Sequence, residues 1–149
     1  MNFLQQTLRC SWRVNMQNAF YAMIIIALLG GCGTPGKNLP VTEVTAELGA
    51  GRFQEVAIDV ESFYFKPNRI KVIVNIPVRI TLKSGALIIP HNFSLHAPEA
   101  GIDIDQNIGH GQTAIVEFIP AKTGQYSFFC AKDGHAHKGM TGTLVVLPQ

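Results

Sequence analysis

Charge is scarce in this sequence, and lysine and arginine nowhere form a run. Charged residues make up 15% of the 149 positions. From residue 32 onward, ten Lys and Arg residues are balanced by ten Asp and Glu residues, so this part of the chain is formally neutral. Nucleic-acid binding needs a basic surface, and the sequence offers no electrostatic case for it. The apolar fraction of 47% is ample for a buried core and unlike that of a disordered chain.

Cysteine is scarce as well. The three cysteines are Cys10, Cys32 and Cys130. The first two lie in an N-terminal segment with the features of an export signal, so Cys130 is the only thiol in the rest of the chain. A lone cysteine cannot form an internal disulfide. In an exported protein, an unpaired thiol suggests a reactive or metal-bound sulfur.

The N-terminus predicts a signal peptide. Arg9 and Arg13 supply a positive region, and residues 19–29 form an apolar stretch that is short for a membrane span and typical of a signal-peptide core. The following Leu29-Gly30-Gly31-Cys32 resembles the lipobox of bacterial lipoproteins. That resemblance implies cleavage before Cys32, acylation of Cys32, and a lipid anchor in an envelope membrane with the domain facing the periplasm or the cell exterior. The alternatives are an uncleaved anchor helix and a chance cysteine after an ordinary signal peptide.

The chain divides into three predicted parts. Residues 1–31 are the signal peptide, and residues 32–51 are a flexible tether, rich in Gly and Pro and without a hydrophobic period. Residues 52–149 are the folded domain. It shows no sustained helical period and no internal repeat, while period-two runs recur between Gly and Pro breaks. Seven to eight short strands predict an all-β Greek-key sandwich. Residues 98–111 show no strand pattern and are expected to hold a short helix or a long crossover.

Four residues of the predicted domain have the chemistry of a copper site. His91 begins one predicted strand and Cys130 ends another, and the loop after Cys130 carries His135 and Met140 in the spacing Cys-x4-His-x4-Met. A thiolate, two imidazoles and a thioether suit copper in both of its oxidation states. Zinc is the main competitor, but a thioether is a poor zinc ligand, and structural zinc sites usually close with a fourth Cys or His.

Several segments resemble the cupredoxins, the small blue copper proteins such as plastocyanin, pseudoazurin and the plantacyanins. Phe63-Tyr64-Phe65-Lys66-Pro67-Asn68-Arg69-Ile70-Lys71-Val72 is similar to the family's early aromatic–Pro–strand segment. His91-Asn92-Phe93 is similar to its first-histidine motif, and Gly124-x-Tyr126-x-Phe128-x-Cys130 to its cysteine strand. The run from Gly134 to Val146 is similar to its closing motif.

The resemblance implies one type 1 copper ion. His91 and His135 would be its imidazole ligands, Cys130 its thiolate and Met140 its weak axial ligand. The backbone N–H of Asn92 would donate to the ligand sulfur, a bond that tunes the reduction potential. His137 also lies in the loop, but the family spacing matches only His135. His137, His96 and His110 are therefore expected at the surface.

The function implied by the resemblance is one-electron transfer between redox protein partners by a monomeric domain that is not an enzyme, with His135 as the exit for the electron. A copper nitrite reductase would need a second copper centre, and a two-copper centre needs Cys-x3-Cys, whereas only Cys130 is present. Two alternatives stay open. One is a copper carrier, scavenger or sensor, for which His96 and His137 would be the evidence. The other is a site that reacts with a small ligand at an open position in place of Met140.

Overall fold

Eleven strands and two short 3-10 helices make up the regular structure of residues 40–49 and 51–149, the part of the chain that this computed structural model describes. The strands are β1 (Glu43–Thr45), β2 (Glu47–Leu48), β3 (Gln54–Glu61), β4 (Tyr64–Lys66), β5 (Arg69–Ile73), β6 (Val78–Ser84), β7 (His91–Ala97), β8 (Ile102–Ile108), β9 (Thr113–Phe118), β10 (Gly124–Phe129) and β11 (Thr141–Leu147). The 3-10 helices are η1 (Pro98–Ala100) and η2 (Ala136–Lys138). None of the helices in these residues has the length and hydrophobicity to cross a membrane. The predicted signal peptide and Cys32 lie outside the described residues.

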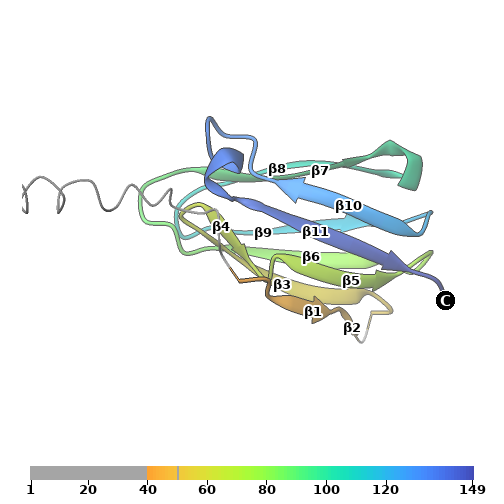
Figure 1. Cartoon of the computed structure of the whole chain (residues 1–149). Helices are drawn as coiled ribbons and strands as arrows, with labels where there is room; N and C mark the ends of the chain where they lie inside the picture. Colours follow the sequence, from red (N-terminus) through yellow and green to blue (C-terminus); the bar gives the residue numbers. More distant parts are fainter. Residues whose placement is uncertain (1–39, 50) are drawn as a thin grey trace, which may run out of the picture. The chain divides into compact units, whose positions relative to one another are not determined.

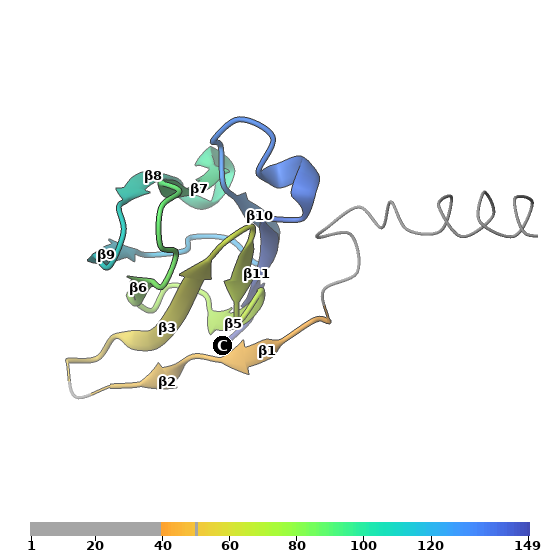
Figure 2. The same ribbon diagram turned by 90° about the vertical axis from the view of Figure 1, so that its left-hand side faces the viewer.

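The strands form two sheets that pack face to face (Figure 1). One sheet has the order β1-β5-β11-β10-β7-β8, and the other has the order β2-β3-β6-β9, with β4 beside β3. Figure 2 views the two layers from the end that carries η2. The prediction of an all-β sandwich is confirmed. The strand number exceeds the expected seven to eight because β1, β2 and β4 have only two or three residues each, too few for an alternating pattern to be visible.

The core lies between the sheets and follows from the alternation of side chains along each strand. In β3 the buried apolar side chains are Val56, Ile58 and Val60, and the register of β3 with β6 sets Val56 beside Ile80. Three phenylalanines, Phe65, Phe93 and Phe128, pack against one another with ring centroids 5.0 to 5.8 Å apart. Phe93 lies two residues after His91, and Phe128 lies two residues before Cys130. This aromatic cluster therefore fixes the two strands that carry the candidate ligands.

Two sequence-based expectations are wrong. Residues 102–108, expected to lack strand structure, form β8, which pairs with β7 from Ala97↔Ile102 to His91↔Ile108. The alternation of Ile102, Ile104 and Ile108 was a strand signal, although Gln106 interrupts it. The short helix expected in this region is η1.

The predicted tether of residues 32–51 is too long. Its second half belongs to the sandwich, because β1 pairs in parallel with β5, and β2 pairs with β3. Asn68 secures this segment by accepting a hydrogen bond from the backbone N–H of Thr42 and donating one to the carbonyl of Pro40. Backbone pairing at a sheet edge needs no hydrophobic pattern, so composition alone did not reveal it. The rest of the predicted tether, residues 32–39, lies outside the described residues.

Candidate metal centre

Three potential ligand atoms converge at one end of the sandwich. The Nδ1 atoms of His91 and His135 are 3.2 Å apart. The Sγ atom of Cys130 lies 3.3 Å from Nδ1 of His135 and 4.0 Å from Nδ1 of His91. His91 and Cys130 are fully buried, and His135 is 7% exposed. Within residues 40–49 and 51–149, these three form the one cluster of at least three His, Cys, Asp or Glu side chains that could hold a metal ion.

The fold brings these residues together because β7 and β10 are antiparallel neighbours. Phe129 is paired with Ser94, so the chain leaves β10 at Cys130 beside the start of β7. The backbone of Cys130 donates to the carbonyl of Met140 at 3.0 Å, and the backbone of Met140 donates to the carbonyl of His135 at 3.1 Å. The loop from Cys130 to Met140 is thereby closed on itself, with strands β10 and β11 at its two ends.

Two glycines allow this loop its shape. Gly134, directly before His135, has φ 73°, and Gly139, directly before Met140, has φ 99°. Side chains with a Cβ rarely adopt these left-handed conformations. Between the two glycines, the backbone N–H of Lys138 donates to the carbonyl of His135 at 3.0 Å. The turn geometry thus sets the direction of both His135 and Met140.

Asn92 connects the cysteine to the neighbouring strand. Its backbone N–H lies 3.4 Å from Sγ of Cys130, as the resemblance to the cupredoxins implies. Its side-chain oxygen accepts from the backbone N–H of Ala131 at 2.7 Å. Its side-chain nitrogen donates to Asp105 at 2.7 Å and to Ser94 at 2.8 Å. Hydrogen bonds from Asn92 and Ser94 lower the pKa of Asp105, so an ionised carboxylate holds the amide of Asn92 in place.

Phe63 covers the histidine rings. Its ring meets the ring of His135 edge to face at a centroid distance of 5.0 Å, and that of His91 at 6.4 Å. The ammonium group of Lys138 lies 4.0 Å from the centroid of Phe63, within the range of a cation–π contact. Phe63 belongs to the cupredoxin-like segment of the sequence, but these contacts were not predictable because they join residues far apart in the chain.

The electrostatic environment keeps both imidazoles neutral. Burial lowers the pKa of His91, and the neighbouring His135 lowers it further. Burial also lowers the pKa of His135, with a smaller effect from Lys138. A neutral imidazole has a free lone pair for a metal ion. The opposite ring nitrogen of His91, Nε2, is buried and has no hydrogen-bond partner in the described part of the chain.

The donor spacing fits a single small metal ion. Two nitrogens at about 2.0 Å from one ion at a tetrahedral angle lie about 3.3 Å apart, and a nitrogen and a thiolate sulfur lie about 3.5 Å apart. The observed separations of 3.2, 3.3 and 4.0 Å bracket these values. A buried set of one sulfur and two neutral imidazole nitrogens is also the donor chemistry that copper prefers.

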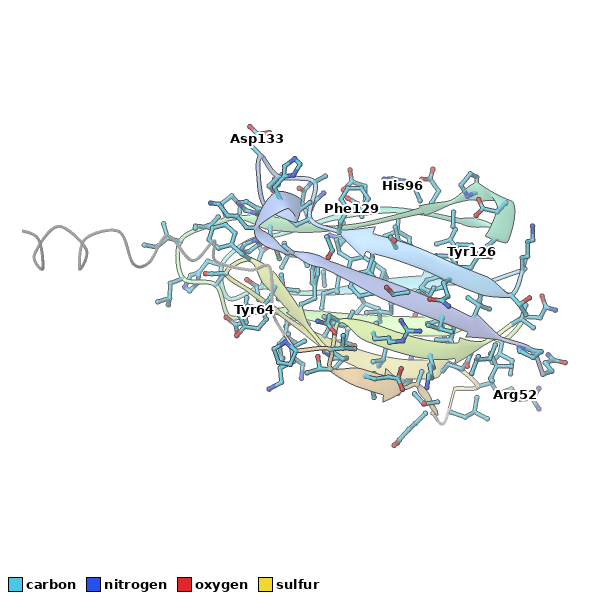
Figure 3. All side chains as sticks on the ribbon, viewed as in Figure 1. Arg52, Tyr64, His96, Tyr126, Phe129 and Asp133 are labelled. Carbon is cyan, nitrogen blue, oxygen red and sulfur yellow. The ribbon has the colours of Figure 1, made fainter. Side chains whose placement is uncertain are left out.

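The remaining sequence candidates lie beside or outside this cluster. Met140 is fully buried, and its backbone is bonded to both Cys130 and His135. His137 is exposed on η2. His96 pairs with Asp103 at 2.7 Å, and its ring centroid lies 6.3 Å from that of Phe129. Figure 3 labels His96 and Phe129, together with Asp133 in the loop from Cys130 to Met140, called the ligand loop below. His110 is hydrogen-bonded to the carbonyl of Ala86.

Comparisons with known proteins agree with the fold. The model of the cupredoxin-like domain family matches residues 22–146. Reduced auracyanin from Roseiflexus castenholzii superimposes with a TM-score of 0.55 at 16% identity, covering 63% of this chain and 97% of that one. The metal-binding domain of the Cu(I)-exporting P-type ATPase CopA from Streptococcus pneumoniae D39 has a TM-score of 0.54 at 23% identity, covering 73% and 99%. Among curated proteins, no sequence matches the chain.

Proposed function

Since the chain belongs to the cupredoxin-like domain family and has a type 1 copper site formed by buried His91, Cys130 and His135 with Met140 nearby, we propose that it carries single electrons between redox proteins. The observation that supports this best is the convergence of one sulfur and two imidazole nitrogens in a buried, closed loop. When bound, copper supplies a one-electron couple between its two oxidation states.

Each of the four residues has a distinct role in this proposal. Cys130 would supply the thiolate, His91 and His135 the two imidazole nitrogens, and the buried Met140 a thioether. Soft sulfur donors suit the reduced ion, and imidazoles suit both states. The aromatic cluster and the closed loop hold these donors in place, so little rearrangement accompanies a change of charge.

His135 is the proposed point of electron exchange. It is 7% exposed, whereas His91, Cys130 and Met140 are all 0% exposed. A partner protein at this end of the sandwich would approach His135 more closely than any other ligand. With one cluster of metal-ligating side chains in the described residues, no catalytic role is proposed.

Repeated oxidation and reduction test this function. In cyclic voltammetry followed by copper analysis, an electron carrier gives a reversible wave and keeps its copper over many cycles. Loss of copper within a few cycles, with the fold intact by circular dichroism, would overturn electron transfer.

The second candidate is copper handling, either delivery or scavenging. It is favoured by the likeness of this fold to the metal-binding domain of a Cu(I)-exporting ATPase, whose structure contains Cu(I). A delivery protein must release its metal on demand. Reduced protein is therefore expected to lose copper rapidly to a Cu(I) chelator if it delivers the metal, and slowly if it carries electrons.

The proposed location is the cell envelope, with a lipid on Cys32 anchoring the mature chain to a membrane. The basis is the short apolar stretch that ends in Leu29-Gly30-Gly31-Cys32. Two or three acyl chains suffice for stable anchoring. Mass spectrometry of the N-terminal peptide is expected to show residue 32 as the first residue, carrying acyl chains; an unmodified Cys32 would refute the anchor.

A further inference from the structure

Three consecutive large apolar side chains are exposed next to the metal centre. Leu87 is 77% exposed, Ile88 is 88% exposed and Ile89 is 36% exposed. They occupy the loop between β6 and β7, which ends one residue before His91. The base of this loop is fixed, because Ala86 is buried and its carbonyl is bonded to His110 at 2.7 Å. A fixed loop with an exposed aliphatic tip indicates a contact surface.

The first residues that the structure describes, starting at Pro40, join the sandwich at the end that carries the metal centre. The carbonyl of Pro40 accepts from the side chain of Asn68 at 3.3 Å, and the carbonyl of Asn68 accepts from the backbone of Thr143 at 2.8 Å. Thr143 lies three residues after Met140. The parallel pairing of β1 with β5, and of β5 with β11, likewise aligns Glu43 with Thr143. The C-terminus lies at the opposite end of the strands (Figure 1).

The chain between Cys32 and Pro40 is short. Pro40 is the eighth residue after Cys32, and eight residues span at most about 29 Å when fully extended. A lipid on Cys32 would therefore keep the metal-bearing end, rather than the C-terminal end, close to the bilayer.

We propose that the loop tip formed by Leu87, Ile88 and Ile89 inserts into the membrane surface, so that the metal-bearing end faces the bilayer. This inference rests on the proposed lipid anchor at Cys32. It also specifies the partner in the proposed electron transfer: the protein that reaches His135 is embedded in the same membrane.

The chemistry of the tip favours lipid over a protein partner. Aliphatic side chains partition into the acyl region, whereas protein interface cores are enriched in aromatic residues, Met and Arg, and the tip contains none of these. Three side chains alone would bind a membrane weakly, but an anchor turns the contact into an intramolecular one and raises its effective concentration. The adjacent ligand loop carries Lys132 and Lys138 against Asp133, a balance that anionic lipids tolerate.

A tryptophan scan tests the insertion. Trp12 is the only tryptophan and precedes Cys32, so an Ile88→Trp variant of the mature chain, residues 32–149, has a single indole. Ile119→Trp is the matched control: Ile119 is 54% exposed and lies beside Pro120, whose carbonyl accepts from Asn75 at the C-terminal end. Both variants, with reduced copper, are coupled through Cys32 to a maleimide lipid in phosphatidylcholine–phosphatidylglycerol vesicles with or without brominated acyl chains.

Bromine quenches only an indole that enters the acyl region. Emission of Ile88→Trp is expected to be about twofold lower in brominated vesicles, while that of Ile119→Trp is unchanged. Equal emission of Ile88→Trp in both kinds of vesicle overturns the proposal, as does a change that appears only after membrane proteins are added. If the oxidised form of Ile88→Trp lacks the visible copper band, Leu87→Trp is used in its place. The voltammetry described above uses protein in solution, so a failure of electron transfer and a failure of insertion are seen separately.

Discussion

The backbone N–H of Asn92 lies 3.4 Å from Sγ of Cys130, and the side chain of the same asparagine is bonded to Asp105 on β8. A hydrogen-bonded connection thus runs from the buried sulfur to an exposed carboxylate. A hydrogen bond to a ligand sulfur withdraws electron density from it and raises the reduction potential. The side-chain bonds of Asn92 determine how firmly that N–H is held.

Asn92→Ala is therefore expected to lower the reduction potential. The substitution keeps the backbone N–H and the net charge but removes the bonds to Ser94, Asp105 and Ala131. Weakening one hydrogen bond by roughly 0.5–1.5 kcal/mol corresponds to about 20–60 mV for one electron. Voltammetry measures the shift. Asn107→Ala is the matched control, because Asn107 pairs with Asn92 across the strands but bonds Lys132; an equal shift in both variants would contradict this role for Asn92.

Cys130→Ser is expected to abolish the intense visible band of the oxidised copper protein. The band is a charge transfer from thiolate to copper, and a serine hydroxyl cannot supply it. The side chains are close in size, so the sandwich should stay folded. Absorption spectroscopy with circular dichroism checks both points, and a variant that keeps the band would show that Cys130 is not the thiolate ligand.

The two loop histidines are expected to behave differently. His135→Ala removes a ring nitrogen that lies 3.3 Å from Sγ of Cys130, so added imidazole should be able to bind the metal centre of this variant. His137→Ala removes an exposed side chain and should leave the spectrum nearly unchanged. Titration with imidazole, followed by absorption, compares the variants. If His137→Ala destroys the site instead, the assignment of the loop ligand is wrong.

Met140→Gln is expected to keep the visible band and to lower the reduction potential. The amide oxygen of glutamine is a harder donor than a thioether and stabilises the reduced ion less. The three donors on His91, Cys130 and His135 are unchanged by the substitution. Voltammetry gives the direction, and a raised or unchanged potential would argue against Met140 as the axial ligand.

The copper-free protein is expected to lose stability in acid. The pKa values of His91 and His135 are lowered in the folded state, so the unfolded chain binds protons first. The contribution of these neutral histidines to the free energy of unfolding is fully present above the unfolded pKa of about 6.5. Below that pH it declines by at most about 1.4 kcal/mol per pH unit for each histidine. Urea unfolding at several pH values measures this slope. His91→Gln and His135→Gln should each reduce it, and an unchanged slope in both would refute the explanation.

The candidate site was largely predictable because its signal is local. Cys130, His135 and Met140 lie in a single loop, where spacing and two flanking glycines determine which donors can meet. The fold class was predictable for a similar reason, since the alternating burial along β3 and β6 follows the alternation of apolar and polar residues in the sequence. Strand β8 also carried a partial alternation, which a single glutamine obscured.

Other features depend on contacts between distant segments. Phe63 meets His135, and Asp105 meets Asn92, only because separate strands are brought side by side. Strands β1 and β2 form because an edge of each sheet has unpaired backbone N–H and C=O groups. A segment of almost any composition can form hydrogen bonds with these groups.

The sequence by itself determined the donor chemistry, the alternating strands and the neutral charge, because these depend on residue type and short spacing. The tertiary structure alone decided that Pro40 lies at the same end of the sandwich as the buried His91 and the neighbouring loop tip at Ile88. The physical reason is that strand order and direction are set by packing and pairing across the whole domain. A position along the chain does not reveal the end of a sheet at which it will lie.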